Sequence, residues 1–175
     1  MRQFSSLVYI LFCTVCIAQL DSSQTLSIER QIKEYSKKFD SLFIKSPEKA
    51  FDSMKEAMRL AQKSEHPYAL AEASFQYGRY YLDKSMSDSA SYYFNTADKK
   101  FREMDSLFKP KLIQYYLASV ENLRANYAGA LELIAKNLLL KADNRKDSLL
   151  KLRYINLNAT VYSNLDDQKK VLKKD

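Results

Sequence analysis

Three alanines recur at a fixed interval along the chain. Ala50, Ala90 and Ala130 are separated by steps of 40 residues, and a further step of the same length reaches Lys170. A period in this range is typical of proteins that stack similar helical units, because each unit buries its apolar face only against its neighbours. We therefore predict an all-α protein built from repeated helix pairs. The alternative is an ordinary helical bundle in which the spacing is accidental.

Other small and large residues keep step with these alanines. Gly78 and Ala118 each lie 12 residues before an alanine of the series, and Phe94 and Ile134 each lie four residues after one. Small residues let two helices approach closely, while large residues fill the remaining space between them. The residues that we expect to pack within and between the repeats are Tyr77, Gly78, Tyr81, Ala90, Phe94, Ala97, Leu117, Ala118, Ala130 and Ile134.

The order of these residues resembles the tetratricopeptide repeat (TPR) family. The resemblance is carried most completely by Tyr77, Gly78, Tyr81, Ala90, Phe94 and Ala97. It weakens further along, because Glu121 occupies a position that is usually apolar and Lys170 one that is usually small. The resemblance implies a right-handed α-solenoid of antiparallel helix pairs, a TPR-like superhelix, with helices longer than the usual repeat of ~34 residues requires.

The chain contains only 2 glycines and 3 prolines, which favours long helices joined by short turns. We expect an N-terminal helix in residues 19–45, followed by the repeat array in residues 46–175 with an incomplete last repeat. In the last repeat, a helix over 147–164 is expected to end before Asp166 and Asp167, which would begin a short second helix. Either the chain is a fragment of a longer protein, or this short helix caps the array.

Residues 1–18 have the pattern of a secretory signal peptide. Arg2 supplies the positive start, an apolar run extends from Leu7 to Ile17, and Cys16 and Ala18 are small residues at a spacing that suits cleavage after Ala18. We therefore expect export to the periplasm of a Gram-negative type of bacterium. An uncleaved membrane anchor and a lipoprotein are the alternatives, and contact with a membrane is expected only through an uncleaved signal or a downstream span.

The sequence offers no catalytic site. His66 is the only histidine, and both cysteines, Cys13 and Cys16, lie inside the predicted signal peptide. The motifs that cradle phosphate or bind zinc are absent. The formal net charge of +7 comes from 28 basic residues interleaved with 21 acidic ones, so a nucleic-acid partner is not expected within this region. We predict that the protein is not an enzyme and holds no metal or cofactor.

In TPR-like arrays, the first helices of the pairs line a concave groove that binds peptides or protein segments. The resemblance therefore implies groove positions at Phe75, Arg79, Leu82, Tyr115, Ser119, Asn122, Ile155, Ala159 and Tyr162. We predict a non-catalytic scaffold that binds a protein or peptide partner in the periplasm. The alternative is the extracytoplasmic sensor region of a larger membrane-bound signalling protein, either a histidine kinase or a helix-turn-helix transcriptional regulator. The incomplete last repeat favours this alternative.

Overall fold

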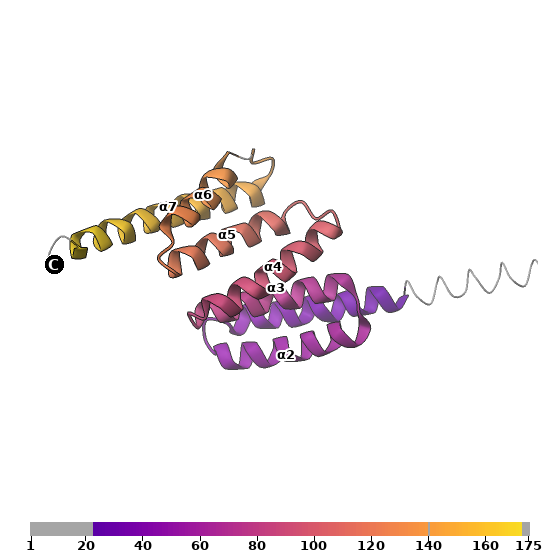
Figure 1. The fold of residues 1–175 in the computed structure, drawn as a ribbon. Helices are drawn as coiled ribbons and strands as arrows, with labels where there is room; N and C mark the ends of the chain where they lie inside the picture. Colours follow the sequence, from indigo (N-terminus) through magenta and orange to yellow (C-terminus); the bar gives the residue numbers. More distant parts are fainter. Residues whose placement is uncertain (1–22, 140, 173–175) are drawn as a thin grey trace, which may run out of the picture. The chain divides into compact units, whose positions relative to one another are not determined.

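The computed structural model describes residues 23–139 and 141–172. All secondary structure in these residues is helical, without a strand, which confirms the predicted all-α class (Figure 1). None of the described helices is long and apolar enough to cross a membrane. The predicted signal peptide, residues 1–18, lies outside the described residues. The chain divides into two compact units, residues 1–69 and 70–175.

The first unit contains a helix over residues 23–42 and the helix α2 (Pro47–Ser64), joined by a short turn. Pro47 stands at the start of α2, where a missing amide hydrogen costs little. Ser46 occupies the N-cap position of α2, but its side chain makes no capping hydrogen bond. The fully buried side chains of this unit are mostly apolar, and they include Ile32, Phe39, Ala50, Met54 and Ala61.

The second unit begins within α3 (Pro67–Asp83) and continues through four further helices. They are α4 (Ser87–Glu103), α5 (Lys109–Leu123), α6 (Tyr127–Leu138) and α7 (Arg145–Leu172). Each helix from α4 to α6 packs against the next one, and α5 also packs against α7. Ring contacts of Phe75 with Phe94 and with Tyr116 join α3 to α4 and to α5. The first helices of successive pairs are therefore spatial neighbours: α3 contacts α5, and α5 contacts α7.

The turns after the helices repeat at a regular interval. Glu65, Ser85, Asp105 and Ala125 all have a positive φ, between 52° and 58°, and each lies 20 residues after the one before it. After α3, α4 and α5, the amide of this residue donates to the carbonyl three residues earlier, and the next amide donates to the carbonyl five residues earlier. This is the Schellman pattern, which ends a helix in a left-handed residue. None of the four residues is a glycine.

The predicted packing residues lie mostly inside the molecule. Ala90, Ala118 and Ala130 are fully buried, and Ile134 and Tyr154 belong to one cluster with the latter two alanines. Two of the ten, Tyr81 and Leu117, are only half-buried.

The prediction of a short extra helix after Asn164 is wrong. The helix α7 runs without interruption from Arg145 to Leu172, 28 residues in all. The sequence between these ends has neither glycine nor proline, so nothing in it breaks a helix. Asp167 is accommodated within the helix, where its carboxylate lies 2.9 Å from Nζ of Lys170 one turn later. Lys109 and Pro110 begin α5.

Candidate functional site

A partly buried polar network links α3 to α5. Oε2 of Glu72 lies 2.6 Å from Nζ of Lys109, and the Glu72 side chain is only 5% exposed. Gln76, which is also buried, donates to Oε1 of Glu72 at 3.1 Å, and Arg79 donates to Oε1 of Gln76 at 2.6 Å. Because a buried carboxylate is costly without a partner, this network fixes which part of α5 lies beside α3. Glu72 and Gln76, polar residues on an otherwise buried helix, are not among the site residues predicted from the sequence.

Phe75 does not line a groove. Its side chain is 3% exposed, and its ring contacts those of Phe94 and Tyr116. Nζ of Lys109 lies 4.6 Å from the centre of the ring, within the range of a cation–π interaction. The prediction for Phe75 is therefore corrected, since this residue belongs to the core between α3, α4 and α5. Arg79 and Leu82 are half-buried on the same helix.

The predicted groove residues of α5 face α7 and the backbone of α5 itself. The ring of Tyr115 makes an edge contact with that of Tyr154, their centres 5.6 Å apart. Oδ1 of Asn122 accepts a hydrogen bond from Nδ2 of Asn164 at 3.1 Å. The hydroxyl of Ser119 donates to the backbone carbonyl of Tyr115 at 3.1 Å. All three side chains are half-buried, and Tyr115 and Asn122 take part in the α5–α7 contact.

Tyr154 on α7 also contributes to the contact between α5 and α7. It is 2% exposed, and its hydroxyl donates to the backbone carbonyl of Lys111 at 2.8 Å. Burial, together with the neighbouring Tyr115, raises the pKa of Tyr154 above its ordinary value. The phenol therefore stays protonated and available as a donor at any physiological pH. Tyr154 is a structural residue of the second unit.

The predicted groove residues of α7 lie on the opposite side of that helix. The buried face of α7 carries Leu150, Tyr154, Leu157 and Val161. Ala159 lies two residues from both Leu157 and Val161, a rotation of about 200° around the helix in either direction. Ile155, Ala159 and Tyr162 are exposed, so they point away from Tyr115, Ser119 and Asn122 on α5. The nine predicted residues therefore do not form one continuous groove.

An exposed apolar row runs along this outer side of α7, and we call it the α7 stripe. Its large members are each about half exposed: Leu149 at 52%, Leu152 at 56%, Ile155 at 49% and Tyr162 at 52%. Ala159 completes the row at helical spacing. Exposed apolar rows of this kind mark interaction surfaces more often than isolated exposed residues do. Leu149 and Leu152 were missed in the sequence, although they continue the spacing of Ile155 and Ala159.

A hollow of about 290 Å³ lies between the beginning of α5 and the beginning of α7, and we call it the α5–α7 hollow. Its wall is apolar and its rim carries two exposed cations, Lys146 and Arg153. Such a hollow suits an apolar side chain with a negative charge beside it. The residues that line it are Phe108, Leu112, Lys146, Leu149, Leu150 and Arg153.

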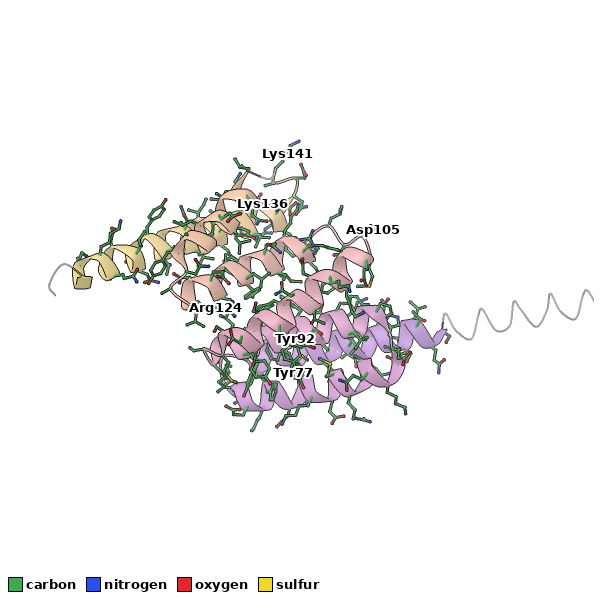
Figure 2. All side chains as sticks on the ribbon, viewed as in Figure 1. Tyr77, Tyr92, Asp105, Arg124, Lys136 and Lys141 are labelled. Carbon is green, nitrogen blue, oxygen red and sulfur yellow. The ribbon has the colours of Figure 1, made fainter. Side chains whose placement is uncertain are left out.

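A larger and more polar basin of about 630 Å³ lies near the turn between α4 and α5. Figure 2 labels Asp105 and Lys136, which both line it. Two of its cations are already engaged within the chain: Arg102 with Asp98 at 2.7 Å, and Lys111 with Asp147 at 3.4 Å. The basin therefore presents less unsatisfied charge than its lining residues suggest.

Among the described residues, no group of three or more His, Cys, Asp or Glu side chains is placed to hold a metal ion. Comparisons of the chain with protein-family models, with curated proteins and with solved structures found no match.

Proposed function

We propose that this chain is a non-catalytic scaffold that binds a protein or peptide partner. In this proposal, the α5–α7 hollow receives an apolar side chain of the partner, and Lys146 and Arg153 attract acidic residues next to it. The single observation that carries the proposal is the composition of this hollow, apolar inside and cationic at its rim. Phe108 and Leu112 on one wall, with Leu149 and Leu150 on the other, provide an anchor pocket of the kind that dominates protein interfaces.

We further propose that the helix pairs form a TPR-like, right-handed solenoid. Two regularities support this proposal. The left-handed turn residues recur every 20 residues from Glu65 to Ala125, which is half of the 40-residue period of the alanines. Polar contacts between neighbouring first helices recur at nearly the same separation, since Glu72 pairs with Lys109 and Lys111 pairs with Asp147. Nearest-neighbour contacts of this kind are what a stacked repeat requires.

The proposed location is the periplasm, because residues 1–18 have the pattern of a signal peptide. The alternative proposal is the extracytoplasmic sensor region of a larger membrane-bound signalling protein. The uninterrupted α7 changes how the last repeat is divided into helices and does not distinguish between the two proposals.

The proposal is tested by selecting binders from a displayed library of random peptides against the full chain. We expect the selected peptides to combine an aliphatic or aromatic residue with nearby acidic residues. Their affinity should fall at least about tenfold with Leu112→Glu or Arg153→Glu, because one change puts a charge into the apolar wall and the other reverses the charge at the rim.

Lys136→Glu is the matched control, because it makes the same kind of charge reversal at the polar basin rather than at the hollow. It should leave the affinity within about twofold of the wild type, because it lies outside the hollow and affects binding only through long-range charge. Peptides without acidic residues, or peptides that bind all three variants equally well, would refute the assignment of the hollow.

A further inference from the structure

The outer side of α7 has a symmetrical order of residues. Leu152 and Ala159 lie equally many residues from the midpoint between Ile155 and Asn156, one on each side. Leu149 matches Tyr162 in the same way, and Arg145 matches Asp166. Each matched pair joins partners that fit one another: a large with a small residue, an aliphatic with an aromatic residue, and a cation with an anion.

This order is what two antiparallel copies of one helix need. Every residue of a helix advances by about 1.5 Å, so residues that are equally far from the midpoint come to lie opposite each other when two copies run in opposite directions. Ala159 of one copy would then face Leu152 of the other, which allows close approach, and Tyr162 would cover Leu149. In such a two-fold symmetric interface, each contact between two different residues occurs twice, because each copy contributes both residues.

The electrostatics distinguish the antiparallel arrangement from the parallel one. In an antiparallel pair, Arg145 of each copy lies beside Asp166 of the other copy. In a parallel pair, Arg145 would lie beside Arg145 and Asp166 beside Asp166. Like charges placed opposite each other at an interface are unfavourable, so the charges of this helix specify the antiparallel pairing.

The position of the stripe within the second unit leaves it accessible. The opposite face of α7, with Leu150, Tyr154, Leu157 and Val161, is the one that packs into the unit. The C-terminal half of α7 extends past the ends of α5 and α6, as Figure 1 shows. Residues 166–170 are accordingly exposed, so Asp166 can be reached by a second molecule.

We propose that the α7 stripe is a homodimer interface, in which a second copy of the chain packs its own α7 antiparallel across Leu149, Leu152, Ile155, Ala159 and Tyr162. The apolar residues supply the contact area, and the Arg145–Asp166 pairs at both ends fix direction and register.

Sedimentation equilibrium of the full chain tests this proposal. We expect a dimer for the wild type, and a monomer for Ile155→Glu, because that change places two carboxylates at the two-fold axis. Leu107→Glu is the matched control: Leu107 is 83% exposed, lies outside the stripe, and should leave the dimer intact. Circular dichroism should show the same helical content for all variants, since both substituted side chains are exposed.

A charge exchange tests the register. Arg145→Asp or Asp166→Arg alone should weaken the dimer about tenfold, because each puts like charges opposite each other. The double variant Arg145→Asp/Asp166→Arg should return the dissociation constant to within about threefold of the wild type, because it restores opposite charges across the interface. A wild type that stays monomeric at about 1 mM would overturn the proposal, and so would a double variant no tighter than the single ones. Leu149 belongs to both surfaces and is not substituted in either test. None of the three substituted residues lines the α5–α7 hollow, so these variants can lose the dimer while every residue of the hollow is kept.

Discussion

Gly78 on α3 and Phe94 on α4 are in such close contact that a Cβ atom at residue 78 would lie 2.6 Å from Cδ1 of Phe94. Two more atoms of the same ring, Cε1 and Cγ, would lie within 2.9 Å of it. Phe94 is fully buried, so its ring has little room to move away. A glycine in the middle of a helix costs about 1 kcal/mol relative to alanine. The close approach of the two helices explains why the chain carries this cost.

We expect Gly78→Ala to destabilise the protein by about 1 kcal/mol, because overpacking outweighs the gain in helix propensity. Gly78→Leu should cost about 3 kcal/mol. The check is urea unfolding followed by circular dichroism. In the double variant Gly78→Ala/Phe94→Leu, the smaller side chain relieves the clash, so the two effects should be less than additive. A Gly78→Ala variant that is more stable than the wild type would contradict this close contact.

The ion pair between Lys109 and Glu72 gives a second prediction. Lys109→Met keeps the length of the side chain but removes the ammonium group that lies 2.6 Å from the Glu72 carboxylate, whose side chain is 5% exposed. We expect a loss of about 3 kcal/mol, since removing one partner of a buried ion pair is strongly destabilising. Lys55→Met is the control, because the pair of Lys55 with Asp52 is exposed on both sides. It should cost less than about 1 kcal/mol, and equal losses in the two variants would argue against a special role for Glu72.

The left-handed turn residues give a third prediction. Ala125 has φ = 58°, a conformation in which a side chain is strained and glycine is not. Ala125→Gly should therefore raise the free energy of unfolding by about 1 kcal/mol. The same substitution at Ala135, an exposed position within α6, should lower it by about 1 kcal/mol. Thermal unfolding of the two variants checks the signs, and a destabilised Ala125→Gly would contradict the assigned turn.

The pH dependence of stability follows from Tyr77. Burial, together with the neighbouring phenols of Tyr93 and Tyr81, raises the pKa of Tyr77 from 10.0 to about 12. The unfolded chain therefore loses this proton at a lower pH than the folded chain does. The contribution of Tyr77 to stability is complete below pH 10 and is lost as the pH rises from about 10 to about 12.

Melting temperatures between pH 9 and pH 12 test this relationship. Tyr77→Phe should show a shallower decline than the wild type over that range, because the group that titrates has been removed. Tyr92→Phe removes a phenol that is 66% exposed and should retain the slope of the wild type. Identical slopes for the wild type and Tyr77→Phe would rule out Tyr77 as the cause.

Much of the helical framework could be predicted from the sequence. The periodic alanines and the scarcity of glycine and proline predicted an all-α chain of long helices joined by short turns, because burial of one helix face dominates both the sequence pattern and the fold. Ala50, Ala90 and Ala130 are all fully buried. The end of α7 was not predictable in the same way. Asp166 and Asp167 suit a helix start, but without a glycine or proline before them nothing forces the previous helix to stop.

The site was less predictable than the framework. The resemblance to the TPR family assigns certain helix positions to the groove surface. Whether a side chain at such a position is covered depends on contacts between helices that are distant in sequence. Phe75 is covered by Tyr116, 41 residues later, and the side-chain oxygen of Asn122 accepts a hydrogen bond from Asn164. The polar partner of Glu72 lies 37 residues away, so no local pattern indicates it. The α5–α7 hollow likewise arises only when Leu112 and Leu149 are brought together.

Methyl-resolved NMR of the leucine-labelled chain can show whether a partner segment binds in the α5–α7 hollow. When a selected acidic–apolar peptide is added, the methyl resonances of Leu112, Leu149 and Leu150 should shift most, because these side chains line the hollow. Leu107, in the wall of the polar basin, should be almost unaffected. The largest shifts at Leu107, or no shift at the three hollow leucines at saturating peptide, would show that the peptide does not bind in the hollow.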